Sequence, residues 1–457
     1  ISYCLGIVAV DPLENNLLFE RFLEPGRAGM PDIDVDFEKA RRGEVLDMLM
    51  AKYGADRVAR IGSFQAKKSR GVIRGAASVL RLGTLGDQLA KAVPIGDGGQ
   101  PFSFKKLFDP SEHAAEMFRT RLAAAGEDGE RIIALARGME NAVVGESIHA
   151  CGTLISDVPL PTLVPLRTDR SASKIAALNS VTQWDGKDID DYGLLKLDVL
   201  GIRNLDIVSL AAKMIADTTG EVIDPDRLPH PNTKGDRRID AAWELLRSGR
   251  TAGVFQMESS GMANLARAVG PETLGDLSAV VALYRPGPMS AGMHEMYADR
   301  KNGLQQVDYS IFTRDAAEQD AIAEVLGETY GVFVYQEQLM RLGTVVAGFD
   351  VKMRSKLRKA VGKKIPALMA EVGTAFVEGA EQEHYDDAGA LISRRFQRAT
   401  AEKLFEYMKG SADYLFNASH SLAYAQLAFV TAYLKANWPS AYGAAILATT
   451  ATTANEK

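Results

Sequence analysis

Two short acidic segments hold the residues whose spacing is best suited to chemistry. In the segment 31–37 (PDIDVDF), aspartate alternates with apolar residues, so that Asp32, Asp34 and Asp36 occupy every second position. Strict alternation predicts a strand with all three carboxylates on one face. Their side chains would project about 6–7 Å apart, and like charges at that distance repel unless cations compensate them. Divalent cations, which prefer oxygen ligands, are suitable compensators.

The second segment, 193–201 (GLLKLDVLG), predicts a largely apolar strand with Lys196 and Asp198 on one face. An aspartate in such a strand is costly to bury without a partner. If this strand lies beside the first, Asp198 joins Asp32 and Asp34, and Lys196 lies next to them. Such a cluster can bind two metal ions and offer a cation to a phosphate group.

Other interpretations of these carboxylates stay open at this point. A solvated acidic face in 31–37 and a turn-capping Asp198 would need no function. A glycosyltransferase-like D-x-D site also fits, but the pattern is nonspecific. A calcium-binding loop is disfavoured, because Ile33 and Val35 stand where turn-forming residues are needed and no glycine follows.

Two basic segments could contact phosphate groups. The segment 352–364 (KMRSKLRKAVGKK) contains seven basic residues and no acidic one. On a helix its apolar residues would form one face, and the mutual repulsion of its charges favours an anionic partner over a solvated surface. A second basic cluster, in 57–74, fits a nucleic-acid backbone or a triphosphate as well as it fits a solvated surface.

Composition bounds the class of protein. The chain has 457 residues, of which 46% are hydrophobic and 25% charged, which predicts about three folded domains and excludes a mostly disordered chain. The net charge is -6, so contact with a polyanion must come from local patches. No apolar run is long enough for a transmembrane helix, and the start lacks both a signal peptide and an initiator Met, which indicates a piece of a longer protein.

Isolated residues add little. Cys4 and Cys151 form neither a metal-ligand pattern nor a disulfide framework, which agrees with a reduced, cytoplasmic setting. His149, beside Cys151, is interpreted as a packing residue rather than as part of a site. The aromatic residues of 414–433 are likewise assigned to the core rather than to a base-stacking surface.

The elements that must position these residues follow from periodicity. Two regions, 1–63 and 144–203, have the mixed pattern of α/β structure, and the segment 64–143 between them predicts a small helical subdomain. A helix is expected at 38–53. The Pro/Gly-rich loop 224–236 is the best candidate for a domain boundary. Beyond it, helices are expected at 259–269, 314–327, 336–347, 366–382, 399–409 and 422–436.

Seven motifs then occur in an order that resembles one family. They are PDIDVDF, GLLKLDVLGI, AGVFQMESSGM, ALYRPGPM, TYGVFVYQEQLM, KLRKAVGKK and FNASHSLAYA. The chain resembles, over essentially its whole length, the α subunits of bacterial DNA polymerase III, the C family of replicative polymerases. The resemblance implies an α+β multidomain fold. A polymerase-β-type nucleotidyltransferase palm with a mixed sheet (1–63 and 144–203) would carry a helical thumb insertion (64–143), followed by large, mainly helical fingers (204–457).

The resemblance also implies roles for individual residues. The catalytic, metal-binding aspartates would be Asp32, Asp34 and Asp198. Lys196, Arg358 and Lys359 match basic positions that face the incoming triphosphate, and Arg70 matches a basic position near the same pocket. The implied cofactor is a pair of Mg²⁺ ions, with Mn²⁺ as a substitute.

The implied function is template-directed DNA synthesis from dNTPs on primer-template DNA, in replication or error-prone repair. A sliding clamp and other replisome subunits would bind through regions absent from this chain, at the nucleoid in the cytoplasm and without a membrane partner. The family's Gly-Ser triphosphate loop normally precedes the first residue, so the chain is expected to be a central fragment. Lys359 in place of a second arginine, Ala418 in place of a basic residue, and Cys151 in place of glycine indicate a divergent member. The alternatives are a non-catalytic DNA- or replisome-binding paralogue and a two-metal nuclease or phosphohydrolase.

Overall fold

The chain divides into two compact units. The computed structural model describes residues 2–18, 30–31, 33–96, 99–169, 178–363, 365–411 and 414–455. One unit, the sheet unit, comprises Gly29–Ile202, and the other, the helical unit, comprises Ile1–Ala28 and Arg203–Lys457. The division therefore falls at residue 203, where the mixed pattern of the sequence gives way to the helical one.

A six-stranded mixed sheet forms the centre of the sheet unit, as the alternating patterns predict. Its strand order is β1-β6-β3-β2-β5-β4, with β1–β6 and β2–β5 parallel and the other neighbours antiparallel. The strands are β1 (Ile33–Glu38), β2 (Val58–Ala66), β3 (Val143–Ile155), β4 (Leu166–Thr168), β5 (Ser180–Thr182) and β6 (Leu195–Ile202).

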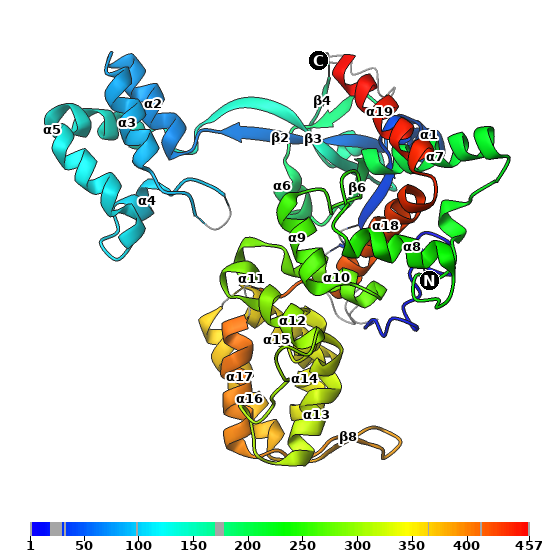
Figure 1. Cartoon of the computed structure of the whole chain (residues 1–457). Coiled ribbons are helices and arrows are strands. Elements are labelled where there is room, and N and C mark those ends of the chain that lie inside the picture. Colours follow the sequence, from blue (N-terminus) through cyan, green and yellow to red (C-terminus); the bar gives the residue numbers. More distant parts are fainter. Residues whose placement is uncertain are drawn as a thin grey trace. The chain divides into compact units, whose positions relative to one another are not determined.

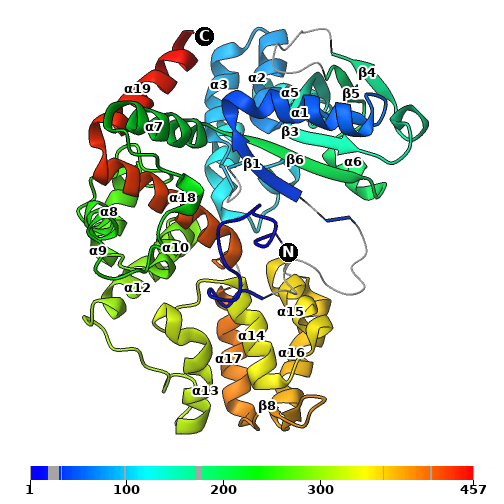
Figure 2. The ribbon, with the colours of Figure 1, turned by 90° about the vertical axis from the view of Figure 1, so that its right-hand side faces the viewer.

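One helix covers each face of this sheet. Helix α1 (Arg42–Tyr53) lies across one face (Figure 2), where Leu46 and Leu49 pack against Val58 and Val199. It begins later than expected, because Lys39–Arg41 form a single 3-10 turn. Short helix α6 (Gly186–Asp191) contributes the buried Ile189 to a second cluster on the opposite face.

Strands β2 and β3 extend beyond the sheet to a cluster of helices (Figure 1). These are the helices expected between residues 64 and 143, namely α2 (Ser69–Val79), α3 (Gly83–Ala92), α4 (Phe104–Leu107) and α5 (Glu116–Arg137). They enclose their own apolar core, in which Phe118 is fully buried.

The helical unit contains all six helices that the sequence predicts beyond residue 258, displaced by at most a few residues. Those six are α9 (Ser260–Val269), α13 (Ala316–Leu326), α14 (Gln336–Ala347), α16 (Pro366–Ala380), α17 (Arg398–Ser411) and α18 (Ala418–Asn437). The others are α7 (Arg203–Thr219), α8 (Arg237–Arg247), α10 (Leu274–Leu283), α11 (Pro286–Ser290), α12 (Met293–Lys301), α15 (Val351–Lys363) and α19 (Pro439–Asn455). Within the described ranges, every helix is too short or too polar to traverse a lipid bilayer.

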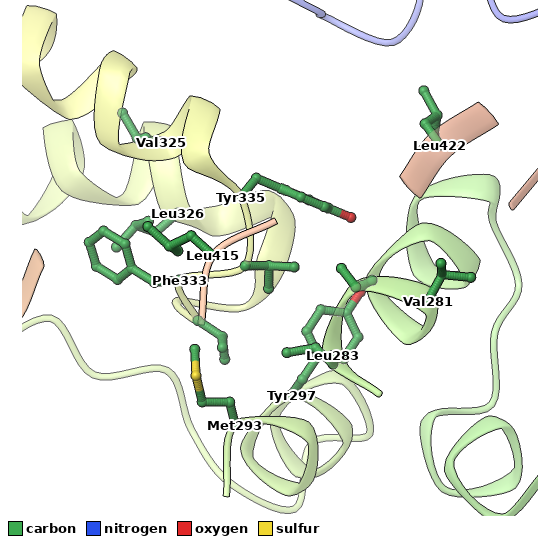
Figure 3. Close-up of a cluster of buried hydrophobic side chains, with 14 of the residues drawn as sticks. Val281, Leu283, Met293, Tyr297, Val325, Leu326, Phe333, Tyr335, Leu415 and Leu422 are labelled. Atoms are coloured by element: carbon green, nitrogen blue, oxygen red, sulfur yellow. The ribbon is translucent and has the colours of Figure 1, made fainter. Parts of the chain in front are cut away.

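The largest apolar core of the chain lies inside this unit. Figure 3 shows a part of it, where Tyr297 of α12 lies beside Leu283 of α10 and Phe333, before α14, lies beside Leu326 of α13. Tyr297 is 1% exposed and donates a hydrogen bond of 3.2 Å to Asp276, which Lys301 approaches to 3.6 Å. The core therefore contains a buried, paired carboxylate rather than apolar groups alone.

The loop 224–236 is not a domain boundary. It lies within the helical unit, because Trp243 Nε1 donates to the carbonyl of Pro231 at 2.9 Å and Leu274 N donates to Asn232 at 2.8 Å. These bonds hold the loop against α8 and α10, so its prolines shape a fixed connection. Residues 2–18, which the sequence groups with the α/β region, also belong to the helical unit, where Val10 is buried.

A two-stranded hairpin leaves the helical unit between α16 and α17. It consists of β7 (His384–Tyr385) and β8 (Leu391–Ser393), and Ser393 at its base is buried and donates to the carbonyl of Val345 at 2.8 Å. We predict that Ser393→Ala lowers the free energy of opening of this hairpin by about 1–2 kcal/mol, because the carbonyl loses its partner. Faster amide hydrogen exchange in 384–393, with unchanged exchange in α2–α5, would be the expected readout. Unchanged exchange in the hairpin would contradict it.

Candidate active site

The parallel register of β1 and β6 brings two of the predicted carboxylates together. Asp34 stands directly opposite Asp198 on the neighbouring strand. Paired residues of adjacent strands point to the same face, and their backbones lie about 5 Å apart. The apolar alternates, Leu197 and Val199, face α1, so the carboxylates occupy the other face of the sheet. Asp32 lies outside the described residues.

Lys196 accompanies Asp198, as the strand pattern predicts. Its ammonium nitrogen lies 3.4 Å from Oδ2 of Asp198, and the two side chains are only 16% and 13% exposed. The other carboxylate oxygen, Oδ1, is buried and has no hydrogen-bond partner among the described residues. A buried carboxylate oxygen without a donor is costly, so this atom is suited to receive a cation.

A glycine on the third strand is paired with Asp198. Gly152 of β3 opposes Asp198 across the β3–β6 ladder. On its other side β3 bulges, because the four residues His149–Gly152 oppose the single Ile61 of β2. The ring nitrogen Nδ1 of His149 accepts the backbone N–H of Gly152 at 2.7 Å, and a Cβ on Gly152 would lie 2.8 Å from that nitrogen. His149 is therefore a local structural residue, as expected, and it fixes the strand that flanks Asp198.

The pKa of the Cys151 thiol depends on the charged groups around it. Burial raises the pKa of Cys151, the nearby Arg42 guanidinium opposes that effect, and the negative charges of Asp198, Asp34 and Asp36 add to it. These three carboxylates therefore act on one point of the bulge, and Asp36 belongs to the same electrostatic cluster as Asp34.

The carboxylate pair fits a hard divalent cation in its chemistry. Two aspartates on adjacent strands supply oxygen ligands, and Oδ1 of Asp198 is unsatisfied by protein donors. Within the described ranges, no group of three or more His, Cys, Asp or Glu side chains is arranged to hold a metal ion. Asp32, the third predicted member, lies outside these ranges.

The basic helix α15 belongs to the helical unit. Its apolar face is as expected, since Leu357, Ala360 and Val361 are buried. Arg358 is half-buried and Lys359 is exposed. Charge on this helix is partly compensated, because Lys356 forms an ion pair with Glu371 of α16. Of the seven basic residues in 352–364, Lys364 lies outside the described residues.

The basic residues of the second cluster, in 57–74, make hydrogen bonds and an ion pair within the sheet unit. The guanidinium of Arg70, at the start of α2, donates from Nε to the carbonyl of Val93 at 3.1 Å. Arg74 pairs with Asp87 at 2.8 Å, and Lys68 donates to Asn141 at 2.9 Å. Arg57 donates to the carbonyl of Asp157 at 2.5 Å. These contacts give the cluster structural roles that the charge pattern alone does not reveal.

The aromatic residues near the C-terminus divide into two groups. Phe429 and Tyr433 are buried in the core, as expected. Phe416, however, is only half-buried and lies 5.5 Å from the ring of His420, which stacks on Tyr424 at 4.3 Å. Phe416 and Tyr424 also pack against the largest apolar core, so these rings lie at its edge and agree with the expected core assignment.

Two family models match the chain, and one ends and the other begins near residue 203, where the sheet unit ends. The model described as the bacterial DNA polymerase III alpha NTPase domain matches residues 1–201, and the bacterial DNA polymerase III alpha subunit finger domain matches residues 204–384. The chain belongs to the bacterial DNA polymerase III alpha family. The boundary between the two matches coincides with the carboxyl end of the sheet unit, whereas the first match also includes residues 1–28 of the helical unit.

Curated relatives of this polymerase III alpha chain align along nearly all of it. The DNA polymerase III subunit alpha of Campylobacter jejuni is 38% identical over 453 residues, which are 98% of this chain and 34% of the relative. The subunit of Aquifex aeolicus is 34% identical over 466 residues, 98% of this chain and 37% of the relative. That of Mycobacterium tuberculosis is 36% identical, with 98% and 36% covered. The chain thus spans about a third of the length of these relatives.

Proposed function

We propose that this chain carries the catalytic centre of a template-directed DNA polymerase, which joins a dNTP to the 3′-hydroxyl of a primer. The observation that carries the proposal is the parallel register in which Asp34 opposes Asp198, with Lys196 at 3.4 Å from the second carboxylate. The names of the relatives support the same activity. The sheet of Gly29–Ile202 would act as the palm, helices α2–α5 as the thumb, and the helical unit as the fingers.

Asp32, Asp34 and Asp198 would hold two Mg²⁺ ions, or Mn²⁺ as a substitute. When bound, these ions would activate the primer 3′-hydroxyl and compensate charge on the triphosphate. In this structure the ammonium of Lys196 offsets part of the negative charge of Asp198. Because Lys196 lies on the carboxylate face of the sheet, we expect its ammonium to contact the phosphate oxygens of a bound dNTP.

Arg358, Lys359 and Arg70 are the other proposed nucleotide-binding residues. The buried apolar face of α15 holds Arg358 and Lys359 on a rigid helix, which favours a fixed orientation of their charges. Arg70 already donates to Val93, so we expect it to act through its charge and by holding α2 in place. The proposed partners are primer-template DNA and dNTPs, together with a sliding clamp and other replisome subunits bound through further regions of the longer protein.

Primer extension with the full-length parent protein tests this proposal. We expect growth of a labelled primer and release of pyrophosphate with Mg²⁺, in proportion to each other and only with a complementary template. Shortening of the primer would instead support a two-metal nuclease. The absence of any product with either Mg²⁺ or Mn²⁺, despite binding of DNA, would favour a non-catalytic paralogue.

Gly152→Ala should lower dNTP incorporation by the full-length protein roughly 10- to 100-fold, equivalent to about 1–3 kcal/mol. The new Cβ would meet His149 Nδ1 at 2.8 Å and Ile61 at 3.0 Å, so the bulge must shift beside Asp198. Steady-state incorporation measures this effect. Gly186→Ala, where the added Cβ meets nothing within 4 Å, is the matched control and should keep wild-type activity. Equal activity of the two variants would show that the bulge does not position the carboxylate.

Arg358→Ala should raise the KM for dNTP about 10-fold or more, because a charge-assisted contact to phosphate is lost. Exposed Arg398, which pairs with Glu381 on another part of the helical unit, provides the control Arg398→Ala. Incorporation rates measured as a function of dNTP concentration give kcat and KM separately. A lower kcat with an unchanged KM would remove Arg358 from nucleotide binding.

A further inference from the structure

A groove on the helical unit lies apart from the residues discussed so far. Its volume is about 290 Å³, and it lies between α13, α14 and β8. The residues that line its walls and carry the inference are Asp320, Glu324, Val345, Leu391, Ile392 and Arg394. A volume at the low end of the range for ligand pockets, about 300–1,000 Å³, suits a few side chains rather than a folded domain.

The walls of this groove are fixed by hydrogen bonds. Ser393, next to Ile392, donates to the carbonyl of Val345 at 2.8 Å. The backbone N–H of Phe396 donates to the carbonyl of Ala380 at 2.7 Å, and that of Gln397 donates to the buried carboxylate of Glu318 at 2.5 Å. Because α13, α16 and the segment after β8 are already tied together, a ligand would not have to order them. A preformed site reduces the entropy cost of binding.

Two carboxylates on one wall lack partners. Asp320 and Glu324 are exposed and one helical turn apart on α13, where like charges repel by a few tenths of a kcal/mol. Among the described residues, neither carboxylate takes part in a hydrogen bond or an ion pair. A cation placed between them would remove this repulsion, whereas a nucleic-acid phosphate would increase it.

The opposite wall is apolar and exposed. Leu391 is 52% exposed and Ile392 is 40% exposed, and Tyr385 on the paired strand is 56% exposed. Large apolar side chains gathered on one small hairpin are typical of an interaction surface. Arg394, at the end of β8, adds a guanidinium that can donate to backbone carbonyl groups of a bound segment.

We propose that this groove docks an extended peptide segment of a partner protein in which a lysine or arginine is flanked by aliphatic residues. The basic side chain would pair with Asp320 and Glu324, and the aliphatic side chains would cover Leu391 and Ile392. The charge of the acidic wall selects a protein segment over DNA. This docking is independent of the catalytic function proposed above, because none of its residues belongs to the carboxylate cluster or to α15.

Fluorescence polarisation with the full-length protein tests the docking. The probe is a labelled peptide, Gly-Leu-Arg-Leu-Lys-Leu-Gly, for which we expect a Kd on the order of 10–100 µM, typical of a small interface. The double variant Asp320→Lys/Glu324→Lys should weaken binding at least 10-fold. Leu391→Ser should weaken it severalfold at unchanged salt sensitivity. Asp387→Lys is the matched control, because this exposed residue lies in the turn of the hairpin and outside the groove.

Two further peptides determine whether the groove has the stated preference. A probe with glutamate in place of arginine and lysine should not bind measurably, and a lysine-glycine peptide of equal charge should bind at least 10-fold more weakly. Equal binding of the lysine-glycine peptide would mean that the groove attracts any cation and would overturn the proposal. The proposal is also overturned if the wild-type protein fails to bind the first probe at 1 mM, or if the double variant binds it as well as the control does.

Discussion

Asp198→Asn should reduce dNTP incorporation by the full-length polymerase about 10³- to 10⁴-fold, a loss of about 4–5.5 kcal/mol of transition-state stabilisation. The substitution keeps the size of the side chain but removes the charge that opposes Asp34 across the β1–β6 ladder. An amide supplies a single weak oxygen ligand and cannot replace a carboxylate toward a hard cation. Affinity for primer-template DNA should stay nearly unchanged.

Stability must be measured beside activity for this variant. Lys196, only 16% exposed, loses its ion pair with Asp198, so we also expect a loss of about 1–3 kcal/mol in the sheet unit. Asp190→Asn is the matched control, because Asp190 is exposed on α6 of the same unit. Binding of Mn²⁺, followed by electron paramagnetic resonance, should fall in the Asp198 variant and not in the control. Wild-type incorporation by Asp198→Asn would remove Asp198 from the mechanism.

Glu318→Ala should lower the free energy of unfolding of the helical unit by about 3–5 kcal/mol. This carboxylate is 3% exposed and accepts hydrogen bonds from Thr313 at 2.5 Å and Thr400 at 2.7 Å. A third bond, from the backbone N–H of Gln397, ties it to the chain entering α17. Alanine would leave the buried hydroxyls of Thr313 and Thr400 and the partly buried N–H of Gln397 without this acceptor, and each buried donor carries a desolvation cost of about 1–3 kcal/mol.

Native-state hydrogen exchange in α13 and α17 measures this loss directly. Glu318→Gln should fall between the wild type and alanine, because one amide oxygen can still accept. Glu324→Ala, an exposed glutamate on the same helix, should change the free energy of opening by less than about 0.5 kcal/mol. If Glu318→Ala and Glu324→Ala have the same effect, the network around Glu318 does not stabilise the unit.

The local sequence pattern was sufficient to predict most of the helices and strands. The alternation in 31–37 and 193–201 predicted β1 and β6 together with the faces that they present, and the helical periodicity predicted α9, α13 and α14 closely. These predictions succeeded because side-chain periodicity is a property of consecutive residues, and burial of one face follows from it. The seven motifs likewise led to the family to which the chain belongs, because they were numerous and in order.

The tertiary structure decided which residues distant along the chain contact one another. Nothing in either segment requires Asp34 to stand opposite Asp198 rather than one residue away, and a slip of one position would turn every carboxylate to the other face. Other features were likewise decided by tertiary contacts. They are the bulge at His149–Gly152, the hydrogen bond from Trp243 to the loop 224–236, and the hydrogen bonds of Arg70 and Glu318. Each depends on partners distant along the chain. Sequence alone thus determined the elements and their polar faces, whereas register and long-range hydrogen bonds, which only the folded chain fixes, determined the site.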